Sequence, residues 1–363
     1  MLKQLFSLLP RSTKTKIMFY YKEIPNTLDI PINIKLKMWR KGFKARNYYY
    51  MDIKNKGTKY YVSELFNYTT HPKNGIYSGL INNKLYLPYC LKNYPEHVPD
   101  YLYLIDKDHV YRLFGDHKVY KKNKDDFCNM FLGKDKKQVG KILGKSGGEG
   151  ILFFEKVSNN DIKINNNQMN MEKGFNIFKN TNQMIFMRFI EPHSYSKRLN
   201  PNTVNGIRIT TGWDVDKHEP FILYGIHKVG RPNMYGADNG ALGGICSAID
   251  IENGIIGKTG IRHSKRVEFV DNHPDTGVQI KGVRIPHYDQ IKRTILQISR
   301  DLNFLKYIGW DIVVTDDSFV ILEMNSNPEL WASQMYKQIL KDERIKKFYE
   351  QFVTKKTEKY FMK

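Results

Sequence analysis

The chain has 363 residues and a formal net charge of +21, from 58 Lys and Arg against 37 Asp and Glu. Hydrophobic residues make up 41% of it, enough for a sizeable core, and no apolar run approaches the roughly 18 residues of a membrane-spanning helix. Three scattered cysteines, Cys90, Cys128 and Cys246, argue against a disulfide framework or a zinc site, and they suit a reducing compartment.

The N-terminal sixth of the chain carries more than half of the surplus charge. Residues 1–60 hold fourteen Lys and Arg against three acidic residues, a surplus of eleven. We therefore expect residues 1–65 to form a basic, mostly helical leader. Trp39, Phe43 and the tyrosine run 48–50 lie among its basic residues, and we expect these rings to be available as apolar anchors.

A basic, aromatic-bearing leader can lie on an anionic membrane surface, or it can bind a polyanionic glycan. The alternative is a solvated helical face with no partner. No nucleic-acid-binding motif accompanies the charge, so no specific nucleic-acid partner is expected. The sequence thus favours a cytoplasmic protein that can be peripheral on the inner face of the membrane.

The rest of the chain is expected to divide into three parts: a small α/β N-terminal segment at 66–112, a core at 113–335, and a C-terminal helix with a basic tail at 336–363. Three helices are expected, at 85–94, at 286–302 and from 328 to about 352, and the clearest apolar stripe is that of 286–302. The Asn-rich run 159–170 is expected to be a loop, because polar low-complexity sequence cannot bury a face.

A Gly-rich stretch at 141–151 lies between two β-like runs. Glycines let backbone N–H groups approach phosphate oxygens closely, and Lys141 precedes them as a candidate phosphate cation. The glycines are Gly144, Gly147, Gly148 and Gly150. The spacing is neither a Walker A nor a Rossmann pattern. Taken alone, such a stretch can also be a plain hairpin loop.

Strands are expected at 208–213, 220–227 and 244–251, followed by a hairpin within 309–327. In this hairpin Asp311 should lie level with Glu323, and Asn325 should project from the same face as Glu323 because it is two residues further along. Three hard oxygen side chains would then converge, which is a common way to build a Mg²⁺ site. The alternative is a solvated hairpin end.

Taken in order, several stretches resemble the ATP-grasp superfamily, most closely the sugar-transfer-associated ATP-grasp family. The similarity covers roughly residues 70–335, and its strength lies in the ordered set. The stretches are Asn83-Lys84-Leu85, 94–99, the Gly loop 144–150, 190–193, 200–205, Asp238-Asn239 with Gly243-Gly244, 273–277 with 285–286, and 309–325.

The resemblance implies an α/β (α+β) fold in which two subdomains clasp MgATP, so that ATP and Mg²⁺ are the expected cofactors. It implies nucleotide binding by Lys141, by the loop glycines, and by Phe189 and Ile190 at the hinge. It implies metal binding by Asp311, Glu323 and Asn325, and catalytic roles for Arg208, Lys228, Asp238 and Asn239. The chain departs from the family at the hinge, where Met187 and Arg188 stand in place of the usual acidic residue or Gln.

The activity that the resemblance implies is ATP-dependent ligation of a carboxylate to an amine through an acylphosphate, in capsule or other surface-polysaccharide synthesis. Two alternatives stay open. One is a kinase of a sugar or small molecule on the same fold. The other is a catalytically silent, basic glycan- or membrane-binding protein that keeps the fold.

Overall fold

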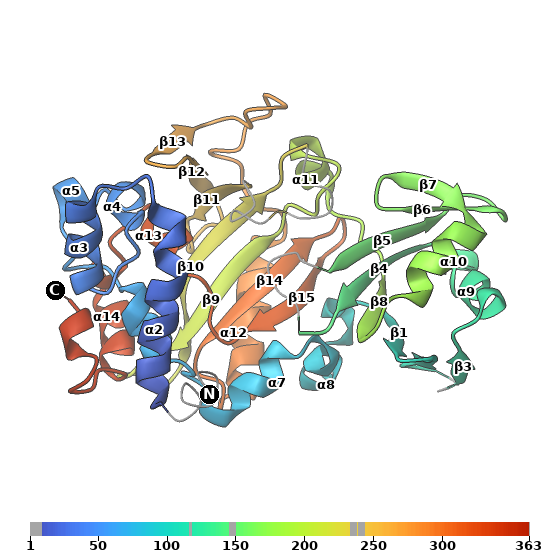
Figure 1. Cartoon of the computed structure of the whole chain (residues 1–363), viewed down its shortest axis with the longest axis horizontal. Helices are drawn as coiled ribbons and strands as arrows, with labels where there is room; N and C mark the ends of the chain where they lie inside the picture. The colour runs from blue at the N-terminus through green and yellow to red at the C-terminus, as the bar shows by residue number, and fades with distance from the viewer. Residues whose placement is uncertain (1–8, 116–117, 145–149, 233–237, 239–243, 363) are drawn as a thin grey trace.

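The computed structural model describes residues 9–115, 118–144, 150–232, 238 and 244–362. Within these residues the strands form two antiparallel sheets that lie side by side, with helices against their outer faces (Figure 1). The described residues contain no helix long and apolar enough to cross a membrane.

The two sheets are named by the lengths of their strands. The larger sheet has the longer strands, seven within the described residues, in the order β13-β12-β11-β10-β9-β14-β15. Their bounds are β9 Ile207–Trp213, β10 Pro220–Val229, β11 Ile245–Ile249, β12 Ile256–Arg262, β13 Val267–Val270, β14 Ile308–Val314 and β15 Phe319–Asn325. This confirms the strands expected at 208–213, 220–227 and 244–251 and the hairpin within 309–327. The order of strands in the sheet makes β9 and β14 direct neighbours, although they are about a hundred residues apart in the chain.

The smaller sheet has eight strands within the described residues, in the order β3-β2-β1-β8-β4-β5-β6-β7. Their bounds are β1 Tyr101–Asp106, β2 His109–Arg112, β3 Val119–Lys121, β4 Lys137–Ile142, β5 Ile151–Lys156, β6 Asp161–Ile164, β7 Asn167–Asn170 and β8 Met184–Arg188. The Gly-rich stretch joins β4 to β5, as the sequence predicted.

The helices are mostly short. Their bounds are α2 Arg11–Glu23, α3 Ile32–Arg40, α4 Asn47–Tyr50, α5 Ile53–Lys56, α6 Glu64–Thr69, α7 Ser78–Asn82, α8 Leu87–Cys90, α9 Lys124–Met130, α10 Met171–Lys179, α11 Ser194–Leu199, α12 Tyr288–Asp301, α13 Trp331–Gln334 and α14 Glu343–Glu350. Single 3₁₀ turns are η1 Pro25–Thr27, η2 Gly75–Tyr77, η3 Lys84–Tyr86, η4 Pro95–His97, η5 Gly133–Asp135, η7 Ile339–Lys341 and η8 Glu358–Tyr360.

Helix α12 confirms the helix expected at 286–302. Ile291, Ile295 and Ile298 recur at the spacing that puts side chains on one helix face, and all three are buried. They belong to the main apolar core, together with Ile209 and Trp310 of the larger sheet. Burial of this stripe fixes the helix against the sheet that carries β9 and β14.

Three local expectations were wrong. Residues 85–94 do not form one helix, because Pro88 cannot donate a helical N–H and the chain instead starts the short helix α8 around it. The Asn-rich run holds the hairpin of β6 and β7, since Ile162 and Ile164 alternate with polar residues and are buried. The helix expected from 328 to 352 is broken, and α14 begins anew where Asp342 caps it.

The leader helices pack onto the rest of the protein (Figure 1). Phe43 and Tyr50 are buried, so the expectation that these two rings act as exposed anchors was wrong. Val62 lies beside the C-terminal region. The Gln334 side chain accepts a hydrogen bond from the Val62 N–H at 2.7 Å and donates one to the Val62 C=O at 3.0 Å. A β-bridge also pairs Val62 with Phe361.

Candidate active site between the two sheets

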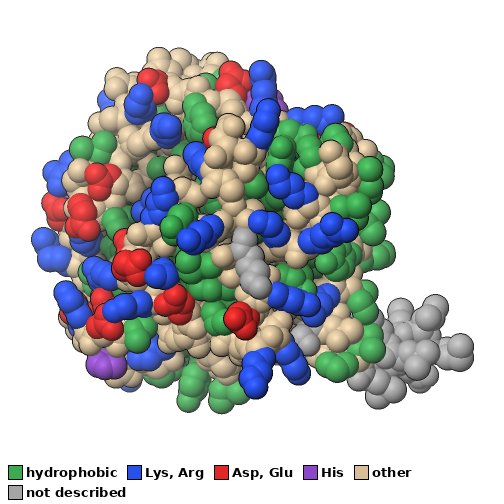
Figure 2. Space-filling model, turned by 90° about the vertical axis from the view of Figure 1, so that its left-hand side faces the viewer, with side chains coloured by type: hydrophobic (Ala, Val, Ile, Leu, Met, Phe, Trp, Pro, Cys, Tyr) green, Lys and Arg blue, Asp and Glu red, His purple; other side chains and the backbone are tan. Residues whose placement is uncertain are grey.

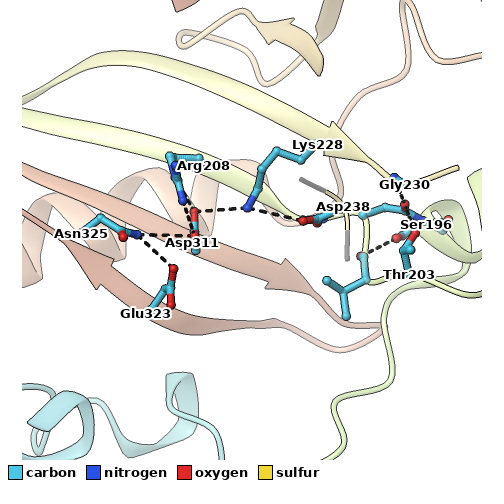
Figure 3. A network of polar contacts seen from close by, with 12 residues as sticks. Ser196, Thr203, Arg208, Lys228, Gly230, Asp238, Asp311, Glu323 and Asn325 are labelled. Carbon is cyan, nitrogen blue, oxygen red and sulfur yellow. Dashed lines mark hydrogen bonds and ion pairs between the residues drawn. The ribbon is translucent and has the colours of Figure 1, made fainter. Parts of the chain in front are cut away.

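The hairpin β14–β15 brings the predicted oxygen side chains together. Asp311 pairs with Glu323 in the register of the two strands, as predicted. The Asn325 amide nitrogen lies 3.5 Å from Asp311 Oδ2 and 3.4 Å from Glu323 Oε1 (Figure 3). The convergence of these three side chains is therefore confirmed as geometry.

Arg208 and Lys228 approach the same carboxylates from neighbouring strands. Because β9 pairs with β14, Arg208 stands opposite Asp311. Its Nε and Nη2 donate to the two Asp311 carboxylate oxygens at 2.6 and 2.5 Å. Lys228 of β10 lies 3.5 Å from Asp311 and 3.7 Å from Asp238, so it links the hairpin to Asp238 (Figure 3).

Two further lysines reach this cluster from other parts of the chain. Lys141 lies one residue before the end of β4 in the smaller sheet, and its charge interacts with Glu323, Asp311, Lys84 and Lys228. Lys84 Nζ lies 3.2 Å from Glu323 Oε2. Lys84 was missed as a site residue, although Asn83-Lys84-Leu85 was one of the stretches that carried the family resemblance. Its role becomes visible only when the fold places 84 beside 323.

Opposite charges in the cluster offset the effect of burial at Asp311 and Lys228. Burial alone would raise the pKa of the Asp311 carboxyl, but Arg208 and Lys228 outweigh it and hold that pKa well below its ordinary value. Burial opposes the charge on Lys228, yet Asp238 and Asp311 raise its pKa above the ordinary value. Burial dominates at Lys141 and lowers its pKa, with partial compensation from Glu323. Four cations thus face three carboxylates.

The side-chain oxygens of this site suit a divalent ion only if phosphate oxygens also bind it. No three His, Cys, Asp or Glu side chains gather closely enough to hold a metal anywhere in the described part of the chain. Glu323 and Asn325 offer hard oxygens, whereas both Asp311 oxygens are occupied by Arg208. The residues fit Mg²⁺ if phosphate oxygens complete its coordination and draw Arg208 away from Asp311.

Two of the loop glycines are described. Gly144 and Gly150 have φ values of +76° and +72°, a region that residues with a Cβ rarely adopt. They frame the connection between β4 and β5. Gly147 and Gly148 lie outside the described residues, as does Asn239. Asp238 itself accepts the Gly206 N–H at 2.7 Å, which ties this carboxylate to the start of β9.

A cavity of about 200 Å³ opens beside the hinge after β8. Its lining includes Lys137, Phe153, Glu155, Phe189 and Thr203, and so draws on the smaller sheet and on the chain before β9. Phe189 thus lines this cavity, and its role in nucleotide binding stays a prediction. Ile190 is not among the lining residues.

Arg188 does not enter this hinge cavity. Its guanidinium pairs with Asp135 at 2.9 Å and with Asp100 on its other side. The charge of this unusual basic hinge residue is therefore neutralised by two carboxylates beside the smaller sheet. Met187 is buried in the main core.

The fold and the site together define a class of protein. Two antiparallel sheets meet at a cluster of cations and carboxylates, and a Gly-rich connection joins adjacent strands of the smaller sheet, which is the arrangement expected of an ATP-grasp fold. The sequence model of the sugar-transfer associated ATP-grasp family matches residues 67–349. The chain belongs to that family. No curated protein matches the sequence significantly.

Three solved structures match the chain at low sequence identity. The chain is 10% identical to N5-carboxyaminoimidazole synthetase from Staphylococcus aureus complexed with ADP, with a TM-score of 0.38, covering 69% of this chain and 46% of that one. D-alanine–D-alanine ligase from Bacillus anthracis is 10% identical, with a TM-score of 0.38 and coverage of 94% and 96%. Biotin carboxylase from Campylobacter jejuni is 10% identical, with a TM-score of 0.41 and coverage of 86% and 53%. The chain spans less than half the length of that synthetase.

Proposed function

We propose that this protein is an ATP-dependent ligase that joins a carboxylate to an amine through an acylphosphate, in the synthesis of a surface polysaccharide. The observation that carries the proposal is the convergence of Lys84, Lys141, Arg208 and Lys228 on one hairpin end with three acidic side chains. Such an excess of partly buried positive charge attracts an anion, and a polyphosphate supplies one.

The nucleotide would lie along β4. Lys137, at one end of this strand, lines the hinge cavity, whereas Lys141, four residues on, projects from the same strand face toward the cluster. At about 3.3 Å per residue the two ends of the site are roughly 13 Å apart. That separation suits a nucleoside at the hinge and its terminal phosphate at the cluster. Phe153 and Phe189, whose rings meet edge to face at 6.1 Å, would contact the base.

The chain's own residues would bind and orient the reacting groups. Lys84, Lys141 and the loop amides would hold the phosphates. Arg208 would turn from Asp311 to the transferring phosphoryl group and offset its developing charge. Mg²⁺ bound by Glu323, Asn325 and Asp311 would supply further charge neutralisation at phosphate oxygens. Lys228 and Asp238 would receive the carboxylate and the amine.

The reaction balances in two displacements. A carboxylate oxygen of the substrate attacks the γ-phosphorus and ADP leaves. The amine nitrogen then attacks the acyl carbon, inorganic phosphate leaves, and the amine gives up one proton. The proposed partners are the carboxylate and the amine. We also propose a cytoplasmic location and peripheral contact with an anionic surface through residues 1–60.

ADP release tests the proposal. Purified full-length protein would be incubated with MgATP and with mixtures of uronic-acid sugars and amino acids or amino sugars. We expect ADP only when both a carboxylate and an amine are present, and we expect hydroxylamine to substitute for the amine and give a hydroxamate from the acylphosphate. ADP release with a hydroxylated sugar alone, giving a stable phosphate ester, would favour the kinase. No nucleotide binding at all would favour the silent binding protein.

A further inference from the structure

The leader carries an apolar face that nothing in the described structure covers. Ile17 and Tyr21 of α2 and Ile24, which follows its last residue, are exposed and recur at the spacing of one helix face. On α3, Ile32 and Leu36 are exposed and one turn apart. Leu28, in the connection between the two helices, is 78% exposed. These six residues are called the leader face below.

The leader face is exposed although both of its helices already pack against the rest of the protein. The opposite sides of the same helices supply Phe19 and Met38 to buried clusters. Each helix therefore has one buried side and one apolar exposed side. Single exposed apolar residues are ordinary on protein surfaces, but six within twenty residues on two neighbouring helices indicate an interaction site.

Positive charge surrounds the leader face. Lys22, Lys37 and Arg40 are exposed on the same two helices. Residues 1–60 carry a surplus of eleven positive charges, and Figure 2 shows Lys and Arg side chains dispersed among hydrophobic ones on this side of the molecule. A basic helical surface with aliphatic side chains at its centre has the chemistry of a helix that lies in the interface of an anionic bilayer.

We propose that the leader face docks the protein on an anionic lipid bilayer. A polyanionic glycan would engage the charges alone, because aliphatic side chains such as Ile24, Leu28 and Ile32 offer it nothing to bind. A bilayer uses both, since the lysines contact phosphate head groups while the aliphatic side chains enter the boundary of the acyl chains. This inference is independent of the reaction proposed for the nucleotide site.

Docking from this face leaves the nucleotide site free. Most of the site residues lie on β9, β10, β14, β15 and the smaller sheet, whereas α2 and α3 lie on the far side of the larger sheet (Figure 1). The two sheets could therefore still clasp a nucleotide while the leader face lies on the bilayer.

A matched pair of triple variants tests the proposal in the full-length protein. Ile24→Ser, Leu28→Ser and Ile32→Ser together remove aliphatic surface from the leader face, where these residues are 53%, 78% and 64% exposed. The control is Ile76→Ser, Val119→Ser and Leu132→Ser, which are 88%, 55% and 54% exposed and lie outside the leader. Thermal unfolding checks both, and the single variant Leu28→Ser replaces the first if it does not fold.

The readout is co-sedimentation with vesicles of phosphatidylglycerol and phosphatidylcholine, with pure phosphatidylcholine vesicles and an immobilised polyuronate alongside. We expect wild type and control to bind the anionic vesicles alike, and the leader variant to bind at least tenfold less. Replacing Lys37 and Arg40 by Gln should lower binding by about fivefold for each charge. Equal binding of the leader variant and the control overturns the proposal, as does polyuronate binding that exceeds vesicle binding.

Discussion

Arg208 and Asp311 face each other across the paired strands β9 and β14, and the guanidinium donates to both carboxylate oxygens at 2.6 and 2.5 Å. Each residue thereby neutralises one that MgATP would otherwise engage. Arg208 would engage a phosphoryl group of the nucleotide, and Asp311 would engage the metal cation. Binding of MgATP would replace one ion pair with two, so the pair holds the site charged and ordered until the nucleotide arrives.

Glu323 is the carboxylate of the hairpin that this pair leaves accessible. Glu323→Gln should abolish ATP turnover, because loss of a catalytic metal contact removes several kcal/mol of transition-state stabilisation. The unfolding free energy should change by about 1 kcal/mol or less, since the side chain is partly exposed. ADP release and urea unfolding measure the two effects. Glu350→Gln, an exposed site on α14, is the control, and turnover equal in both variants would rule out the metal assignment.

Lys84 should be needed for nucleotide binding although it precedes the core. Lys84→Ala should lower the thermal shift caused by MgATP, because a ligand at 100 times its dissociation constant adds about 2.7 kcal/mol of stability and weaker binding reduces that gain. Lys92→Ala removes an exposed lysine from the same segment and should keep the full shift. Identical shifts would mean that the contact between Lys84 and Glu323 is only structural.

Asp311 should make the protein sensitive to acid. Its folded-state pKa is depressed, so its contribution to stability is present above its ordinary pKa of 3.8 and is lost as the pH falls through that range. Asp311→Asn should lower the unfolding free energy near neutral pH by about 3 kcal/mol or more, because Arg208 is left buried without its carboxylate. Its stability should also fall less between about pH 5 and pH 2 than that of wild type, as urea unfolding would show.

Lys73 should make the stability of the protein depend on pH in the alkaline range as well. Burial lowers the pKa of its ammonium group from 10.5 to about 7. Asn67 Oδ1 accepts from it at 2.7 Å, and the Tyr307, Tyr349 and Phe352 rings surround it. The unfolded state keeps its proton to higher pH, so the unfolding free energy should rise between about pH 7 and pH 9.5. Lys73→Met should flatten this rise, whereas parallel curves for both proteins would contradict the burial argument.

The sequence predicted the parts of the site that local pattern controls. Asp311, Glu323 and Asn325 converge because a hairpin with alternating side chains can place them nowhere else. Lys84 could not be placed in this way, since its contact with Glu323 depends on a separation of more than two hundred residues. The pairing of β9 with β14, which sets Arg208 against Asp311, likewise depends on sheet order.

The same distinction applies to the fold. The stripe Ile291, Ile295 and Ile298 identified α12 from its spacing alone. Phe43 was wrongly expected at the surface, because aromatic residues among lysines are typical of an exposed segment. Its ring instead packs with Met51 and Tyr61 in a small buried cluster. Burial of a basic segment depends on surfaces contributed by distant parts of the chain.

The two hydrogen bonds between Gln334 and Val62 have a consequence for how the chain folds during translation. The two residues are 272 positions apart, so at the usual rates of translation Val62 leaves the ribosome on the order of tens of seconds before its partner. Until then the leader helices have no C-terminal region to dock on, and Phe19 and Phe66, which belong to that shared cluster, stay open to solvent. A nascent chain of this protein should therefore be a client for chaperones that shield apolar segments, and docking of the first helices should be among the last events of its folding.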